Sequence, residues 1–332
     1  MNKSILQKIA LGFALGTQLM CSCSKPALLE PEVQFDMQSS AGLKANLSPV
    51  FQLSDISNWM SFLPDSLYLG ELTIPGTHDS GALYEPVAGT AKTQNLSIAE
   101  QLNAGVRFLD MRCRHFNDSF TIHHGAIYQH LNFDDVLEAC RNFLDNHPDE
   151  VIVMSVKPEH EAVGNTKSFV EVFQDYVDKD STLWYQQDGV PRLGDSRGKI
   201  VLLRRFSADN FWGIDAGNGW QDQATFQIDR GNYSLHVQDE YVVGNNNDKI
   251  SAVEALLSQA NDSQVESDLF LNFSSGYQQI LWVIPNIPSV SDDLNPWLVN
   301  YFTQANPVGH YGMIAADFMD TNLSEKLVLS NF

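Results

Sequence analysis

Basic residues are scarce in this chain, which has 20 lysines and arginines against 41 aspartates and glutamates and a formal net charge of -21. Nucleic acids and anionic membrane surfaces are themselves negative, so the overall field of such a protein does not attract them. The composition therefore excludes nucleic acid as the expected partner. Any anionic ligand has to be held by a small number of placed cations.

Cysteine is equally rare, with four in 332 residues. Cys21 and Cys23 lie close to the N-terminus, so only Cys113 and Cys140 remain in the rest of the chain. A dense disulfide framework is excluded, because two cysteines form at most one bridge. Their spacing does not resemble a zinc site, and we expect two buried thiols.

The start of the chain lacks a hydrophobic run long enough for a permanent transmembrane helix. The short apolar stretch Ile9 to Met20 follows two lysines, which is the pattern of an export signal. Cys23 follows a serine, as at the processing site of bacterial lipoproteins, whereas Cys21 follows a bulky methionine. We expect residues 1–23 to comprise a lipoprotein signal peptide, which is removed, and a lipidated Cys23, which anchors the exported protein to a membrane at the periplasm or cell surface. The alternative is an ordinary secretory peptide with incidental cysteines.

Residues 24–48 contain proline, glycine, glutamine and serine with little apolar periodicity, which predicts a spacer. Residues 49–332 show no second linker, internal repeat or low-complexity run. With 43% hydrophobic residues overall, we expect one large domain there, in a monomeric protein.

Short apolar runs alternate with longer amphipathic stretches in that domain, as in strand-helix units around a parallel sheet. The expected strands are Leu69–Ile74, Phe108–Met111, Phe120–His123, Val151–Val156, Ile200–Leu203, Ser234–Val237, Leu269–Phe273 and Met313–Ala316. The expected helices are Ile98–Ala104, Asp134–Asn146, Thr166–Tyr176, Ile250–Ala260 and Pro296–Gln304. Eight strands with too few helices predict an α/β fold, a single imperfect (β/α)8 barrel of the triosephosphate-isomerase type with a parallel sheet.

Nearly every expected strand is followed by a side chain that binds ligands or transfers protons. These residues are His78, Asp110, Arg112, His124, Lys157, Arg205, Asp239, Tyr241 and Asp317. The carboxyl ends of the strands share one face in a parallel barrel, so we expect these side chains to converge. Two histidines serve as base and acid, and the cations stabilise charge, which suits attack on a phosphate diester. An aspartate beside each histidine fixes its tautomer.

Seven segments carry these residues in chain order. They are Ile74–Ser80 (IPGTHDS), Val106–Arg112 (VRFLDMR), His123–Gly125 (HHG), Met154–Lys157 (MSVK), Gly198–Arg205 (GKIVLLRR), Val237–Tyr241 (VQDEY) and Ala315–Phe318 (AADF). Together they resemble the successive signatures of the bacterial phosphatidylinositol-specific phospholipases C. The resemblance covers essentially the whole domain.

The resemblance implies a role for each residue. His78 would be the general base on the inositol 2-hydroxyl, oriented by Asp317, and His124 the general acid on the diacylglycerol oxygen, supported by Asp79. Arg112 would bind the phosphate, with Asp110 as its supporting carboxylate. The inositol hydroxyls would be held by Lys157, Arg205, Asp239 and Tyr241, the last by stacking. The products would be diacylglycerol and a 1,2-cyclic inositol phosphate, formed by an intramolecular transfer.

The resemblance also bears on metal. Calcium-dependent relatives carry asparagine after the first histidine and acidic residues in the second motif, which supply oxygen ligands. Here Asp79 follows His78, and Arg112 stands where a cation would be repelled. We therefore expect metal-independent activity without a cofactor.

Neighbouring residues compete at two of these positions. His124 matches the acid of the family because it directly precedes Gly125, which leaves His123 as structural. Alternation along the strand favours Arg205 over Arg204.

Three features depart from the family pattern or stay open. Cys113 stands where a small residue is more usual, so it either crowds the phosphate pocket or is a neutral replacement. Pro158 follows Lys157 where a second polar residue is expected. The apolar segment 279–291 is either a rim loop that contacts lipid or part of the core.

Two other functions remain as alternatives. A glycerophosphodiester phosphodiesterase is also a barrel with paired histidines, but it needs carboxylates around a divalent ion, and Arg112 counts against that. A non-catalytic surface lipoprotein that binds inositol phosphates or glycans is the other, and the intact set of site residues counts against it. Glycerophosphoinositol and glycosyl-phosphatidylinositol anchors remain open as substrates.

Overall fold

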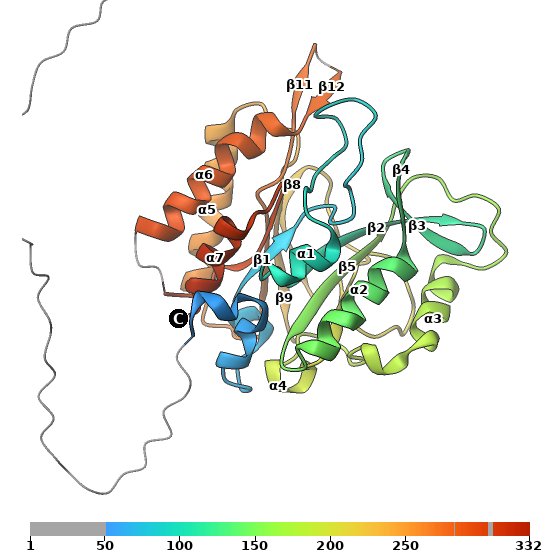
Figure 1. The fold of residues 1–332 in the computed structure, drawn as a ribbon, viewed down its shortest axis with the longest axis horizontal. Helices are drawn as coiled ribbons and strands as arrows, with labels where there is room; N and C mark the ends of the chain where they lie inside the picture. Colours follow the sequence, from blue (N-terminus) through green and yellow to red (C-terminus); the bar gives the residue numbers. More distant parts are fainter. Residues whose placement is uncertain (1–50, 282, 305–307) are drawn as a thin grey trace, which may run out of the picture. The chain divides into compact units, whose positions relative to one another are not determined.

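A computed structural model describes residues 51–281, 283–304 and 308–332, which belong to one unit of the chain (Figure 1). The expected signal peptide, the lipidated Cys23 and the spacer lie outside the described residues. Within the described ranges, no helix is both long and apolar enough to cross a membrane.

A curled sheet forms the centre of this unit, and its described strands run in the order β7-β6-β5-β2-β1-β13-β10-β9-β8. Their bounds are β1 Thr73–Thr77, β2 Phe108–Phe116, β5 Val151–Pro158, β6 Lys199–Arg204, β7 Ile214–Asp215, β8 Ala224–Asp229, β9 Ser234–Asp239, β10 Leu269–Phe273 and β13 Gly312–Ala316. Every neighbouring pair from β7 to β9 is parallel, and β8 is antiparallel to β9. In the described chain β7 and β8 do not pair, so the barrel stays open there. The predicted imperfect α/β barrel is confirmed.

The predicted barrel strand Phe120–His123 was assigned to the wrong place. It belongs to β3 (Ser119–His124), which runs antiparallel to β2 and pairs with β4 (Ile127–Asn132). Only a tight turn separates β2 from β3, and its residues Asn117 and Asp118 have φ of 50° and 54°. Such a turn makes a hairpin, because a parallel connection needs a dozen or more residues.

The first strand also lies later than predicted. Leu69–Glu71 forms a 3-10 turn, η2, and β1 runs through Pro75 and Gly76. Pro75 still accepts a hydrogen bond through its carbonyl from the Arg107 amide at 2.9 Å. A side chain at Gly76 would meet Phe108 at 2.8 Å, which explains glycine in this strand.

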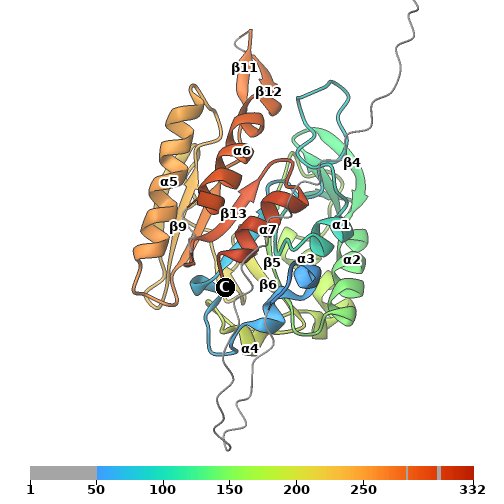
Figure 2. The same ribbon diagram turned by 60° about the vertical axis from the view of Figure 1, so that its left-hand side comes forward.

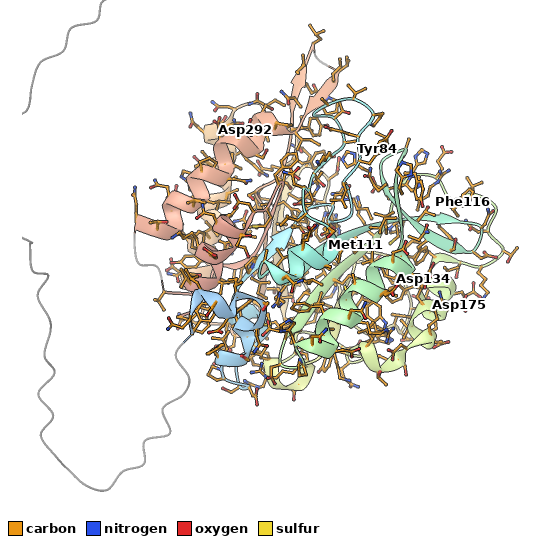
Figure 3. All side chains as sticks on the ribbon, viewed as in Figure 1. Tyr84, Met111, Phe116, Asp134, Asp175 and Asp292 are labelled. Carbon is orange, nitrogen blue, oxygen red and sulfur yellow. The ribbon has the colours of Figure 1, made fainter. Side chains whose placement is uncertain are left out.

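Helices flank the curled sheet (Figure 2). They are α1 Ile98–Asn103, α2 Phe133–Asn146, α3 Phe169–Lys179, α4 Leu193–Ser196, α5 Asn246–Asp262, α6 Pro288–Gln304 and α7 Thr321–Leu329, with 3-10 helices η1 Leu53–Phe62 and η3 Ser181–Leu183. The predicted helix from Pro296 begins eight residues earlier, because Pro288 takes the first helical position. Acidic residues such as Asp134, Asp175 and Asp292 lie exposed on these helices, which spreads negative charge over the outer surface (Figure 3).

Apolar side chains fill two layers, one inside the curl of the sheet and one between sheet and helices. Cys113 and Cys140 are free thiols buried in the outer layer, so Cys113 does not crowd the inside of the barrel. A buried ion pair joins Arg107 Nε to Glu150 Oε2 at 2.7 Å. It connects the start of β2 with the turn before β5.

Candidate active site

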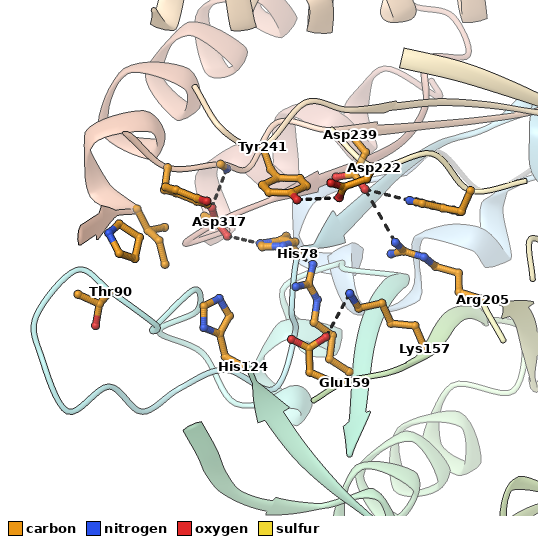
Figure 4. A pocket seen from close by; sticks show the side chains of 16 residues that line it. His78, Thr90, His124, Lys157, Glu159, Arg205, Asp222, Asp239, Tyr241 and Asp317 are labelled. Carbon is orange, nitrogen blue, oxygen red and sulfur yellow. Dashed lines mark hydrogen bonds and ion pairs between the residues drawn. The ribbon is translucent and has the colours of Figure 1, made fainter. Parts of the chain in front are cut away.

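Eight of the ten predicted site residues line one cavity of about 540 Å³, and Asp79 and Asp110 lie buried outside its lining (Figure 4). The eight are His78, Arg112, His124, Lys157, Arg205, Asp239, Tyr241 and Asp317. They meet because the parallel strands bring their carboxyl ends to one face. His124 arrives differently, at the end of the antiparallel strand β3.

Strand pairing brings His78 and Asp317 together. Thr77 at the end of β1 is opposite Ala316 at the end of β13, and each catalytic candidate is the next residue. The Nδ1 atom of His78 lies 2.7 Å from Oδ1 of Asp317, and Nε2 lies 2.6 Å from a terminal nitrogen of Arg112. Since a guanidinium only donates, Nε2 accepts and the proton belongs on Nδ1. This is the tautomer that a general base needs.

Arg112 is held by carboxylates from its own strand and from the β1 loop. Its Nε lies 3.2 Å from Asp110 and 3.8 Å from Asp79. Asp110 also accepts from Ser155 at 3.1 Å and pairs with Arg205 at 3.4 Å. Burial alone would raise the pKa of Asp110, but the charges of Arg112 and Arg205 outweigh it and hold that pKa below its usual value. Asp110 is therefore a permanent anion.

Asp79 lies between Arg112 and His124, whose Nε2 is 4.0 Å from its Oδ2. Its side chain is fully buried, and among the described residues neither carboxylate oxygen has a hydrogen-bond partner. Burial raises the pKa of Asp79, against the lowering effect of Arg112. Burial, then the charges of Arg112 and His78, lower the pKa of His124 to about 4. Burial therefore disfavours the charged form of both groups in the ligand-free site.

The far wall of the cavity presents groups for a polyhydroxylated ligand. The Arg205 guanidinium lies 3.5 Å from the centre of the Trp220 ring and 3.8 Å from Asp239. Trp220 also donates from Nε1 to Asp239 at 3.1 Å. The Tyr241 hydroxyl donates to Asp222 at 2.7 Å. This hydrogen bond, with burial as the second cause, raises the pKa of Tyr241 to about 12.

Sequence reasoning missed Glu159, Trp220 and Asp222 in this lining. Glu159 pairs with Lys157 at 3.1 Å and accepts from the Gly125 amide at 2.9 Å, so it supports the turn after His124. It lies two residues beyond Lys157, directly after the end of β5, and continuing the period-two alternation of that strand by one residue would have found it. Trp220 and Asp222 lie in irregular chain that gives no such signal.

The two contested neighbours point elsewhere. Arg204 pairs with Asp215 at 2.9 Å and bonds the carbonyl of Phe206, away from the lining residues. His123 is buried beside the Tyr128 ring. The cavity therefore receives Arg205 and His124, the members that the sequence favoured.

The apolar segment 279–291 forms a hairpin and the start of α6. Strands β11 (Gln278–Ile280) and β12 (Ile284–Asn286) pair with each other, and Figure 1 shows them projecting from the body. Leu281 and Val283 at the tip are 76% and 75% exposed, so the core interpretation is wrong there. It holds for Ile287, which is buried and, with Pro285, lines the cavity.

Among the described residues, no group of three or more histidine, cysteine, aspartate or glutamate side chains has the arrangement of a metal site. Three cationic side chains line the cavity, those of Arg112, Lys157 and Arg205.

Comparisons with known proteins agree on one family. The profile of the family described as phosphatidylinositol-specific phospholipase C, X domain, matches residues 73–206. A 1-phosphatidylinositol phosphodiesterase of Staphylococcus aureus (strain Newman) is 37% identical over 233 residues, covering 66% of this chain and 74% of that protein. Its counterpart in Listeria monocytogenes is 26% identical over 293 residues, covering 85% and 87%.

Solved structures agree with these relatives. A phosphatidylinositol-specific phospholipase C of S. aureus superposes with a TM-score of 0.77 at 31% identity, over 84% of this chain and 99% of that one. The L. monocytogenes enzyme gives 0.67 at 25% identity, over 83% and 99%.

Proposed function

The chain belongs to the phosphatidylinositol-specific phospholipase C family, and from this membership we infer that it cleaves phosphatidylinositol to diacylglycerol and 1,2-cyclic inositol phosphate. One arrangement supports the inference most strongly. His78, paired with Asp317, and His124, beside Asp79, share one cavity with Arg112. A base, an acid and a phosphate-binding cation are what an internal transesterification of a phosphodiester requires.

The base side of the reaction starts from the contact between Arg112 and His78. A phosphate bound by Arg112 takes over the hydrogen bond that now goes to Nε2, which frees that lone pair. His78 then removes the proton of the inositol 2-hydroxyl, and the oxygen attacks phosphorus. Asp317 stabilises the imidazolium from the Nδ1 side at 2.7 Å.

The acid side ends the step. The bond between phosphorus and the diacylglycerol oxygen breaks, and that oxygen takes its proton from His124. In the free protein, burial lowers the pKa of His124 most, and the charge of Arg112 lowers it further. A bound phosphate anion offsets this charge, so substrate binding favours the protonated His124 that the acid step requires.

We propose that no metal takes part. The Arg112 guanidinium lies 3.2 Å from Asp110 and 3.8 Å from Asp79, the carboxylates that a divalent ion would use. A second cation there would meet the guanidinium charge at contact distance. The inositol hydroxyls bind Lys157, Arg205, Asp239 and Tyr241 in this proposal.

The β11–β12 hairpin supports contact with a lipid surface. Ile280, Leu281, Val283 and Ile284 expose apolar side chains at its tip, while Pro285 and Ile287 at its base line the cavity. A lipid whose headgroup occupies the cavity therefore leaves its acyl chains beside an apolar surface. With a net charge of -21, the apolar hairpin rather than general electrostatic attraction provides the contact.

We also propose that lipidated Cys23 anchors the exported, monomeric protein at the membrane. The serine before Cys23 supports this choice over Cys21. Palmitate labelling of cells that express the full chain tests it: Cys23→Ala should abolish the label, and Cys21→Ala should retain it. Label that survives Cys23→Ala contradicts the anchor.

The product and its response to chelator test the function. The protein without residues 1–23 should release a five-membered cyclic phosphodiester, identified by ³¹P NMR, from phosphatidylinositol at an unchanged rate in EDTA. Glycerol phosphate released from glycerophosphoinositol, and only without EDTA, would instead identify a metal-dependent glycerophosphodiesterase. Binding without product would identify a non-catalytic protein.

A further inference from the structure

Two residues beside the catalytic pair have unfavourable backbone conformations. Asp79, which follows His78, has φ of 38°, and Phe318, which follows Asp317, has φ of 50°. Non-glycine residues rarely adopt positive φ, and bulky ones least of all. Such residues persist where the surrounding structure holds them. The orientation of both catalytic side chains therefore depends on whatever fixes this backbone.

Thr93 contacts both of these residues. Its hydroxyl donates to the carbonyl of Asp79 at 2.8 Å, and its own carbonyl accepts from the amide of Phe318 at 2.6 Å. The side chain is fully buried, and the Thr93 amide is fixed by the Ala82 carbonyl at 2.9 Å.

Gln94 bridges the same two segments with its side chain. Its Nε2 donates to the carbonyls of His78 and Ala316, each at 2.9 Å. Its Oε1 accepts from the amide of Met319 at 3.2 Å. These contacts use both amide hydrogens and the oxygen of a fully buried side chain. One glutamine thus joins the end of β1 to the end of β13.

We propose that Thr93 and Gln94 are positioning residues that set the geometry of the His78–Asp317 pair. The inference rests on the proposed function, because it concerns the same pair. In the described chain neither residue lines the cavity, so neither touches substrate. Both act through backbone carbonyls and amides, and Thr93 offsets the strain at Asp79 and Phe318.

The chain offers a matched control at the opposite end of β1. Asn331 donates from Nδ2 to the carbonyl of Thr73 at 2.9 Å and accepts from the Thr73 amide at 2.8 Å. It fixes the same strand with the same kind of group, away from the cavity. A purely structural effect of losing such an amide should appear equally in Asn331→Leu and Gln94→Met.

Kinetics separates positioning from stability. Gln94→Met keeps the side-chain length and removes all three hydrogen bonds. We expect its kcat to fall about 10-fold to 100-fold with KM within about 2-fold, since displacements of about 1 Å in reacting groups cost this much. Asn331→Leu should lower the melting temperature and keep kcat. Thr93→Val tests the same claim if Gln94→Met does not fold.

A pH profile adds a second readout. In Gln94→Glu, the protonated acid can donate to one carbonyl, whereas the carboxylate donates to none and repels both. Its kcat should therefore fall as pH rises, in a range where the kcat of Gln94→Met stays flat.

An NMR experiment decides the inference independently of catalysis. The Nδ1 proton of His78 should give a downfield resonance that Asp317→Asn removes. Gln94→Met should shift or broaden it, and Asn331→Leu should leave it in place. The inference is overturned if Gln94→Met keeps both this resonance and kcat. If the wild type does not cleave phosphatidylinositol, the proposed function is wrong, and the resonance still tests the positioning.

Discussion

A terminal nitrogen of Arg112 lies 2.6 Å from Nε2 of His78, so in the free site the phosphate-binding group occupies the lone pair of the base. Substrate has to break this contact, which couples phosphate binding to activation of the base. The other candidate histidine, His124, depends on the same arginine. Burial lowers the pKa of His124 most, and the charge of Arg112 is the second cause. Arg112 therefore controls both proton transfers.

The first prediction concerns the shape of this cation. Arg112→Lys keeps the charge but loses the planar fork that reaches Asp110 and a phosphate together. We expect kcat to fall about 100-fold, the cost of losing one transition-state donor. Arg114→Lys, two residues along β2, half-buried and outside the cavity lining, is the matched control and should retain wild-type kcat. Equal rates for the two variants would contradict the role of Arg112.

The pKa of His124 should respond to ligand. NMR titration of the free protein should give His124 a pKa of about 4. The ring is then neutral between pH 4 and pH 6.5, where an ordinary histidine is mostly protonated. Inositol 1-phosphate should raise this pKa, because the anion offsets Arg112. Consequently the alkaline limb of kcat should lie at higher pH than that of kcat/KM. His115, outside the cavity lining, is the internal control, and a ligand-insensitive His124 would contradict the account.

Stability should depend on the buried pair of Arg107 and Glu150. Arg107→Met leaves the Glu150 carboxylate buried without its 2.7 Å partner. We expect a loss of about 3 to 5 kcal/mol in the free energy of unfolding, measured in urea. Lys167→Met, which breaks an exposed pair with Asp175, should have little effect. A similar loss of unfolding free energy in both variants would contradict the claim that burial makes the Arg107–Glu150 pair important for stability.

The hairpin tip should bind lipid. Leu281→Asp and Val283→Asp place charge at positions that are 76% and 75% exposed, so the fold should tolerate them. We expect weaker cosedimentation with vesicles of phosphatidylcholine and phosphatidylinositol. Cleavage of a monomeric short-chain phosphatidylinositol should not change. Val265→Asp, on an exposed loop between α5 and β10, is the control and should bind vesicles like the wild type. If Leu281→Asp and Val283→Asp also bind vesicles like the wild type, the hairpin is not the lipid contact.

The sequence was most informative where strand ends carry polar residues. His78 and Asp317 were predicted to meet, and they do so because the ends of β1 and β13 are paired. The hairpin at β3 was misplaced because a short apolar run carries no sign of strand direction, although the Asn117-Asp118 turn was available as a signal. The periodicity of the sequence does not predict contacts between residues that are far apart in the chain. Gln94 reaches Ala316 across 222 positions, and Trp220 enters the cavity from chain without regular structure.

Leaving-group dependence tests the central claim, that His78 is the base and His124 the acid. Wild type, His78→Ala and His124→Ala would be assayed on phosphatidylinositol and on an inositol p-nitrophenyl phosphate, whose leaving group needs no proton. The account predicts that His78→Ala loses activity on both substrates, whereas His124→Ala loses it on phosphatidylinositol and largely keeps it on the nitrophenyl ester. Equal losses of His124→Ala on both substrates would contradict the assignment.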